Sequence, residues 1–190
     1  KHLSVMGLFG TIANQIDKIL VFHYLGATNL AIYAFAQAIP DQAKGVLKNI
    51  FGVALPKLAV LSEEQLRKSI RTKFFQLTAL TAIGVVAYLF LAPYLFKLLF
   101  PKYLDAVLYS QIYMLGLITI PGITLFGTYF HLKKATQELY ELNIISNTTT
   151  LCITFILIYH FGIEGAAIAN GVSWLILLGV YGYSYRTHKE

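Results

Sequence analysis

Charged residues and cysteine are both scarce in this sequence of 190 residues. Only 13% of the residues are charged and 57% are hydrophobic, whereas an ordinary soluble domain has about 25% charged residues. The single cysteine, Cys152, cannot form a disulfide within the chain. These scarcities argue against a soluble enzyme, a disordered segment and a disulfide-stabilised scaffold. They predict an integral membrane protein.

Sequence motifs of catalysis are missing as well. The chain has no HExxH, GxSxG or P-loop motif and no cysteine–histidine set at metal-binding spacing. We therefore predict no enzyme activity, no metal site and no cofactor; coupling to a proton or a sodium ion stays open. Fifteen Lys and Arg outnumber nine Asp and Glu, but their distribution fits a membrane topology, so we predict no nucleic-acid partner. The histidines lie at the ends of predicted spans or of the chain: His2, His23, His131, His160 and His188.

Long apolar runs separated by charged or turn-like breaks fill the chain. A helix needs about 20 apolar residues to cross about 30 Å of hydrocarbon, so the chain has room for six such helices. No interdomain linker divides residues 1–190. The sequence predicts an all-α membrane protein with spans near residues 3–22, 29–55, 74–99, 107–131, 142–161 and 164–185.

The positions of the basic residues predict how these spans are oriented. Lys and Arg accumulate in cytoplasmic loops. With a cytoplasmic amino end, the outer side receives only Lys97 and Lys102. We therefore predict a multi-pass protein of the cytoplasmic membrane, with both termini of this segment inside. The cytoplasmic side receives ten basic residues: Lys1, Lys57, Arg67, Lys68, Arg71, Lys73, Lys133, Lys134, Arg186 and Lys189.

The connection before the third span carries the signals of a basic amphipathic helix over residues 62–73. Residues 62–65 (SEEQ) have the form of a capping box, in which Ser62 and Gln65 satisfy each other's backbone amides. Apolar residues follow at helical spacing, and basic residues occupy most of the remaining positions. We expect this helix to lie on the inner leaflet and to contact membrane lipids.

Five charged residues fall inside the first two predicted spans. A charge at the middle of a bilayer costs about 2.5–3.5 kcal/mol on insertion scales, so such residues usually face a cavity or a partner. Gln37, Asp41, Lys44 and Lys48 share an arc of about 60° on the second helix. In the first helix a second polar stripe contains Thr11, Asn14, Gln15 and Lys18, with Asp17 beside it.

Because the first two spans run in opposite directions, Asp17 and Asp41 should lie at comparable depth. The two stripes then predict one wall of a hydrophilic cavity. The alternative is that the aspartates and lysines only neutralise one another across the helix interface. Pro40 allows a kink in the second helix.

Weaker signals mark the later spans. Pro121 and Gly122 predict a break in the fourth span. Small residues at four-residue spacing predict a close-packing face in the sixth: Gly165, Ala169 and Ser173. A polar stripe in the fifth favours hydrogen bonds between helices over ligand contact: Asn143, Asn147, Thr150 and Thr154.

Several stretches in fixed order resemble polysaccharide-biosynthesis flippases of the multidrug/oligosaccharidyl-lipid/polysaccharide exporter superfamily. The first are 15–21 (QIDKILV), 24–27 (YLGA), 32–36 (IYAFA) and 39–40 (IP), which resemble the seventh helix of that family and its continuation. Residues 54–56 (ALP), 99–106 (LFPKYLDA) and 159–169 (YHFGIEGAAIA) follow in order. Pro101 departs from the family, which more often has glycine at that turn.

The resemblance implies a twelve-helix protein of two six-helix lobes, of which this chain matches the carboxyl-terminal lobe. It then lacks an amino-terminal six-helix lobe. The implied function is transport of a lipid-linked oligosaccharide by alternating access, with a cationic cavity for the diphosphate. Substrate-binding candidates are Asn14, Lys18, Gln37, Lys44 and Lys48, and ion-coupling candidates are Asp17 and Asp41.

Two other functions fit the sequence. A cation-coupled drug exporter of the same superfamily would handle amphipathic cations and should have a cavity that is acidic on balance. A non-transporting membrane scaffold would have the two polar stripes filling each other and leaving no cavity. The sequence leaves open the sugar composition, the lipid carrier, the coupling ion and the oligomeric state.

Overall fold

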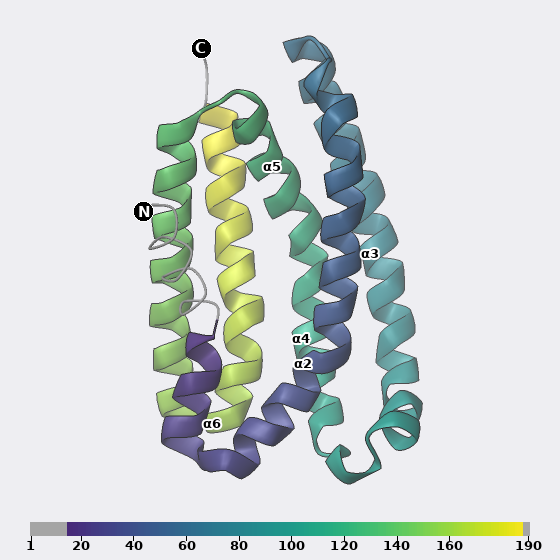
Figure 1. The fold of residues 1–190 in the computed structure, drawn as a ribbon, viewed down its shortest axis with the longest axis vertical. Helices are drawn as coiled ribbons and strands as arrows, with labels where there is room; N and C mark the ends of the chain where they lie inside the picture. The colour runs from purple at the N-terminus through teal and green to yellow at the C-terminus, as the bar shows by residue number, and fades with distance from the viewer. Residues whose placement is uncertain (1–14, 188–190) are drawn as a thin grey trace, which may run out of the picture.

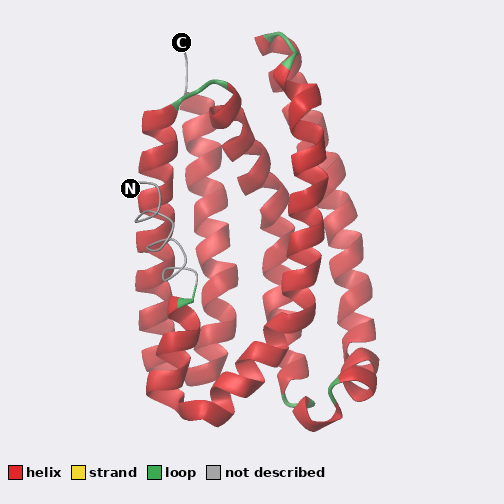
Figure 2. Ribbon diagram, in the orientation of Figure 1, coloured by secondary structure: helices red, strands yellow, loops and turns green. Residues whose placement is uncertain are grey.

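A computed structural model describes residues 15–187, with the side chains of 51–57 and 59 excepted. Every regular element in this range is helical and no strand occurs there (Figures 1 and 2). The chain is therefore all-α over the described range, as predicted. In order along the chain the elements are α2 (Ile16–Ala59), α3 (Glu63–Leu99), η1 (Pro101–Tyr103), α4 (Ala106–Gly116), η2 (Leu117–Thr119), α5 (Ile120–Leu132) and α6 (Thr136–Thr187).

Four helical stretches are long and apolar enough to cross a membrane, which fits a multi-pass membrane protein. They are Ile16–Ile50, Glu63–Leu99, Ala106–Leu132 and Thr136–Thr187. Many large apolar side chains on the outside of the bundle are exposed, as expected for a surface that faces lipid. Most of the predicted first span, 3–22, lies outside the described residues.

Helices α2 and α6 each contain one glycine at which the backbone leaves the helical conformation. Gly26 has φ 80° and ψ 177°, and Gly162 has φ 58° and ψ −133°. Residues with a Cβ rarely adopt either combination. Figure 1 shows the chain turning back at both places, at the same end of the bundle. The sequence predicts breaks at 23–26 and 161–165, and both are present as kinks inside longer helices.

Alanine at Gly26 should destabilise the fold through its backbone alone. A Cβ at Gly26 would have no atom within 4 Å, so its cost is the strain of the positive φ, about 1–3 kcal/mol. The free energy of unfolding in detergent measures this loss. Gly84→Ala is the control, because Gly84 is exposed, has no positive φ and also has open space around its Cβ. Gly84→Ala should stabilise the protein by about 0.5–1 kcal/mol. Equal free energies of unfolding for the two variants would contradict the expected strain at Gly26.

The predicted helix 62–73 and the predicted third span form one helix, α3, without a boundary at residue 74. No glycine or proline interrupts residues 63–83, so nothing in the backbone ends the helix there. The predicted capping box is present at its start, where Gln65 Oε1 accepts a hydrogen bond from the Ser62 amide at 3.3 Å. The basic segment is thus a rigid extension of the third predicted span.

The predicted break at Pro121 appears as a 3₁₀ turn, η2, between α4 and α5. Pro121 has no amide hydrogen for the carbonyl of Leu117, so the α-helical ladder is interrupted one turn earlier. Thr119 Oγ1 donates to the Gly116 carbonyl at 2.8 Å within this turn. Pro40, by contrast, lies in a part of α2 where φ and ψ stay helical, so the chain continues as a helix through it.

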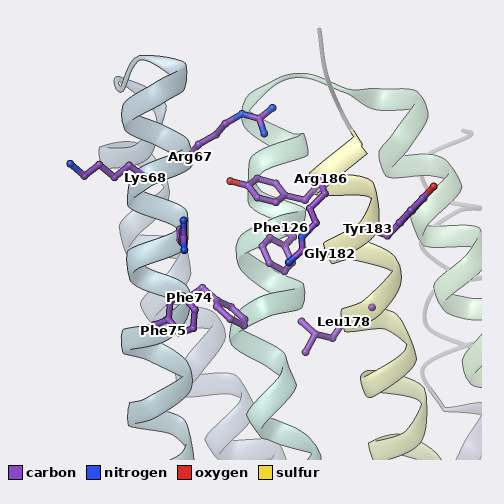
Figure 3. Close-up of a pocket in the computed structure, with 12 residues that line it drawn as sticks. Arg67, Lys68, Phe74, Phe75, Phe126, Leu178, Gly182, Tyr183 and Arg186 are labelled. Carbon is purple, nitrogen blue, oxygen red and sulfur yellow. The ribbon is translucent and has the colours of Figure 1, made fainter.

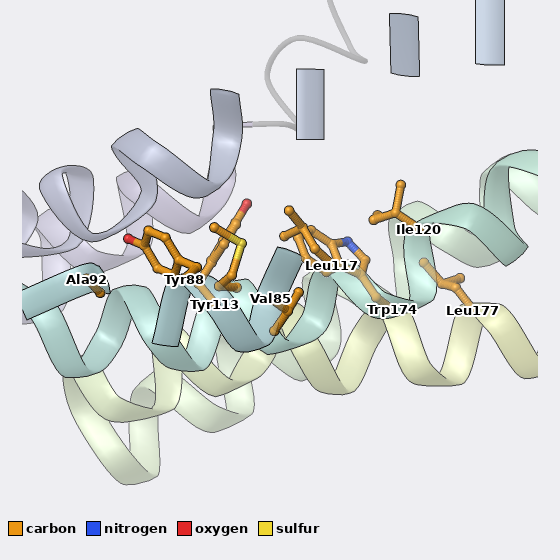
Figure 4. Close-up of a cluster of buried hydrophobic side chains, with 9 residues drawn as sticks. Val85, Tyr88, Ala92, Tyr113, Leu117, Ile120, Trp174 and Leu177 are labelled. Atoms are coloured by element: carbon orange, nitrogen blue, oxygen red, sulfur yellow. The ribbon is translucent and has the colours of Figure 1, made fainter. Parts of the chain in front are cut away.

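Four buried clusters hold the described helices together, and two of them are larger than the others. Near one end, Leu66 and Ile70 of α3 pack with Tyr129 and Phe130 of α5. The second cluster joins α3, α4 and α6 (Figure 4). Gly116 and Gly171 let α4 and α6 approach closely, since a Cβ at Gly116 would lie 3.0 Å from the Gly171 Cα. The predicted small-residue face of α6 is buried: Gly165, Ala169 and Ser173.

The elements that carry the basic residues meet at one end of the bundle. The α2–α3 junction, the α5–α6 turn and the end of α6 lie together, and the kinks at Gly26 and Gly162 lie at the opposite end with η1 (Figure 1). Lys97, in the last turn of α3, and Lys102 of η1 are therefore separated from the basic end, as the sequence predicts. Lys1 and Lys189 lie outside the described residues.

Candidate functional site

A polar cavity of about 430 Å³ lies between α2, α4 and α6. Six of the seven predicted site residues line it: Asp17, Lys18, Gln37, Asp41, Lys44 and Lys48. The seventh, Asn14, lies outside the described residues. The kink at Gly26 folds the first segment of α2 back along the second, so the described residues of the first stripe, Gln15 and Lys18, face the same space as the second stripe. Thr11, like Asn14, lies outside the described residues.

Asp17 is the acceptor at the centre of a hydrogen-bond network. Its Oδ2 accepts from the Tyr33 hydroxyl at 2.9 Å and from Gln37 Nε2 at 3.2 Å. Tyr33 and Gln37 are 1% and 3% exposed, so these bonds are shielded from solvent. Asn170 Nδ2 of α6 donates to the Tyr33 hydroxyl at 3.0 Å. The network ties the two segments of α2 to α6.

Asp41 and Lys44 contact a second group of aromatic residues. The Tyr113 hydroxyl of α4 donates to Asp41 Oδ1 at 3.0 Å. The Lys44 ammonium lies 4.5 Å from the centroid of the Trp174 ring, within cation–π range. Tyr113 and Trp174 meet edge to face with centroids 5.2 Å apart, so one aromatic pair orients both charged side chains. These rings also belong to the buried cluster of Figure 4, which fixes them in place.

The aspartates and lysines of the cavity do not form ion pairs. Within residues 15–187, neither Asp17 nor Asp41 has a lysine or arginine nitrogen within 4.0 Å. Both carboxylates accept from neutral hydroxyl or amide donors instead. The structure therefore does not show the alternative arrangement, in which the aspartates and lysines neutralise one another in direct contact. Three lysines and two aspartates line the cavity, which leaves one net positive charge.

The fifth predicted span contributes to the site differently from the expectation. Asn147 and Thr150 line the cavity together with Ser146, so part of the stripe faces the polar space. Asn143 is exposed and donates to the Leu139 carbonyl at 2.7 Å within its own helix. Thr154 is buried and its hydroxyl has no hydrogen-bond partner.

The sequence prediction lacks the four residues that form the hydrogen-bond and aromatic network around Asp17, Asp41 and Lys44: Tyr33, Tyr113, Asn170 and Trp174. Tyr33 lies four residues before Gln37 and so extends the predicted stripe by one turn. Asn170 follows the small residue Ala169 on the predicted close-packing helix, and Trp174 is the only tryptophan of the chain. The sequence thus contains signals for Tyr33, Asn170 and Trp174, whereas no neighbouring residue of Tyr113 indicates its contact with Asp41.

No family model, curated protein or solved structure matches this chain. The functional interpretation therefore rests on the chemistry of the cavity. Its volume falls in the range of small-molecule sites, about 300–1,000 Å³. Among residues 15–187 no three His, Cys, Asp or Glu residues gather as a metal site would require. Flexible ammonium groups and neutral donors in one shielded space suit an anion with several acceptor oxygens, such as a phosphate.

Proposed function

We propose that this protein is a transporter that moves a lipid-linked oligosaccharide across the cytoplasmic membrane by alternating access. The observation that carries the proposal is a set of lysines that line a cavity between apolar helices and have no carboxylate partner among residues 15–187: Lys18, Lys44 and Lys48. Charges held in such a place cost free energy, and they mark substrate or ion pathways in membrane proteins. The resemblance of the sequence motifs to polysaccharide flippases supports the same function.

In this proposal the lysines bind the diphosphate that joins the lipid to the sugar. Lys48 is exposed at the cavity and makes the first contact, and Lys44 lies deeper against Trp174. Asn147 offers an amide group for the first sugar, and Gln37, whose amide donates to Asp17, orients that carboxylate beside it. Asp17 or Asp41 carries the coupling proton or sodium ion.

The proposed topology is six membrane crossings in a carboxyl-terminal lobe, with the basic end in the cytoplasm. The kinks at Gly26 and Gly162 support this number, because each divides a long apolar helix into two segments of opposite direction. The first crossing would continue from residue 16 toward the amino end. An amino-terminal lobe would close the other side of the cavity.

Transport by the full-length protein in vesicles tests the proposed function. A polyisoprenyl-diphosphate oligosaccharide with a fluorescent sugar serves as the probe, and a membrane-impermeant quencher reports which leaflet contains it. We expect the protein to equilibrate the probe between leaflets, and not the corresponding lipid without diphosphate. Empty vesicles that equilibrate the probe equally fast would contradict the proposal.

The same vesicles separate the two alternatives. A drug exporter predicts that amphipathic organic cations compete with the probe and are themselves transported. The net positive charge of the described cavity lining favours the anionic substrate. A scaffold predicts no movement of either compound, and the polar cavity is an observation against it.

A further inference from the structure

A second and larger groove, of about 920 Å³, opens at the basic end of the bundle between α3 and the last turns of α6 (Figure 3). Its inner part is apolar and aromatic, with Phe74 and Phe75 from α3, Phe126 from α5 and Leu178 from α6. Gly179 lies on the same wall and a Cβ there would meet no atom within 4 Å. The groove therefore has open apolar space beside a helix surface.

The outer part of the groove is basic. Arg67, Lys68 and Arg71 come from the first turns of α3, and Arg186 comes from the last turn of α6. No acidic residue is found in the groove lining within the described range 15–187. Among the residues that the structure describes, Lys68, Arg71 and Arg186 have no carboxylate oxygen within 4.0 Å. In Figure 3, Arg186 extends from α6 nearer the basic end of the bundle than Phe74 and Leu178, whereas Lys68 points from α3 away from α6.

Arg67 is held in place by its neighbours. Its Nη2 donates to the Tyr129 hydroxyl at 2.7 Å, and its Nε lies 3.3 Å from Glu63 Oε1. The guanidinium also lies 5.1 Å and 5.5 Å from the ring centroids of Tyr129 and Tyr185. Lys133 forms an ion pair with the same Glu63. One cation of the groove is thus pre-oriented, and Arg71 and Arg186, which have no carboxylate partner within the described part of the chain, can meet a ligand.

We propose that this groove binds an anionic phospholipid, with its phosphate among the basic residues and an acyl chain along the aromatic wall. Guanidinium groups bind phosphate oxygens through paired hydrogen bonds, and basic pockets between membrane helices suit anionic lipid headgroups. A free phosphate would leave the apolar half of the groove unused. A bound lipid would tie the basic ends of α3 and α6 together. The inference rests on membrane embedding and is independent of the proposed transport.

Lipid binding to the full-length protein in nanodiscs or mixed micelles tests this site. The probes are labelled phosphatidylglycerol, which is anionic, and labelled phosphatidylcholine, which has no net charge. We expect Arg71→Gln with Arg186→Gln to weaken phosphatidylglycerol binding about tenfold, because charge-assisted hydrogen bonds to the phosphate are lost. Gly179→Leu should weaken it as well, by filling the acyl-chain space without changing the charge.

The matched control is Lys73→Gln with Lys134→Gln. It removes two positive charges from α3 and the α5–α6 turn, and neither residue lines the groove. This control should retain phosphatidylglycerol binding. Glycerol phosphate, the headgroup chemistry without an acyl chain, should compete poorly. Equal binding of the two lipids, equal loss in the control, or full competition by glycerol phosphate would each overturn the lipid site. None of these outcomes bears on transport, so the two proposals fail separately.

Discussion

Alanine at both Lys44 and Lys48 is expected to reduce transport of the diphosphate-linked probe by about 100-fold or more. Each lysine is proposed to make charge-assisted hydrogen bonds with the diphosphate, and such bonds contribute about 1.5–3 kcal/mol each. Because about 1.4 kcal/mol corresponds to a factor of ten, losing both lysines removes at least two orders of magnitude of affinity. The rate of leaflet exchange at low probe concentration measures this loss.

The double variant should still insert and fold. Lys48 is exposed in the described structure, and Lys44 contributes a cation–π contact of about 0.5–2 kcal/mol. Lys97→Ala with Lys102→Ala is the control, since it removes the same charge at the far end of the bundle. Unchanged transport in the Lys44 and Lys48 variant, with normal membrane levels, would refute the proposed diphosphate site.

Much of the cavity could be predicted from helical periodicity. Gln37, Asp41, Lys44 and Lys48 lie within one arc of a helix, so any packing that shields one from lipid shields the others. The position of Asp17 follows from the break at Gly26, because two segments joined by a tight turn must lie side by side. Helical periodicity and the glycine at the turn were therefore sufficient to predict that the described residues of both polar stripes line one cavity.

The hydrogen-bond partners could not be predicted in the same way. Tyr113 is 72 residues from Asp41 and Asn170 is 137 residues from Tyr33. Which helices are neighbours depends on close approaches such as Gly116 with Gly171, and a single-helix pattern does not contain this information. The choice between ion pairs and neutral donors depends on rotamers, which sequence spacing leaves undetermined.

Helix boundaries show a related limit. The sequence predicts an amphipathic helix over 62–73 that leads into the third span, and it distinguishes the two because the basic residues differ in composition from the apolar run that follows. Composition changes at residue 74, but the backbone has no reason to end there, and α3 continues to Leu99. Glycine and proline mark some of the interruptions, as at Gly26, Gly162 and Pro121. The breaks at 60–62 and 133–135 contain neither residue.

The hydrogen-bond acceptor of Asp17 should matter for the stability of the fold, and its negative charge should matter for transport. Asp17→Ala removes the acceptor of two buried donors, the Tyr33 hydroxyl and the Gln37 amide. An unsatisfied buried donor costs about 1–3 kcal/mol, so the free energy of unfolding should fall by about 2–6 kcal/mol. Asp17→Asn keeps a carbonyl acceptor for these two donors and loses only the acceptor of the Lys18 amide, which bonds to Asp17 Oδ1 at 2.8 Å. Its free energy of unfolding should therefore fall by only about 0.5–1.5 kcal/mol. Thermal or denaturant unfolding in detergent measures both.

Transport then separates the charge from the structure. If Asp17 carries the coupling ion, the well-folded Asp17→Asn variant loses the dependence of probe movement on an imposed proton or sodium gradient. Asp41→Asn is the matched comparison, since Asp41 accepts from Tyr113 in the same cavity and is the other coupling candidate. Loss in only one of the two variants assigns the ion to that carboxylate. Gradient dependence that survives in both would mean that neither carboxylate couples transport, and the aspartates would then serve only to hold α2, α4 and α6 around the lysines.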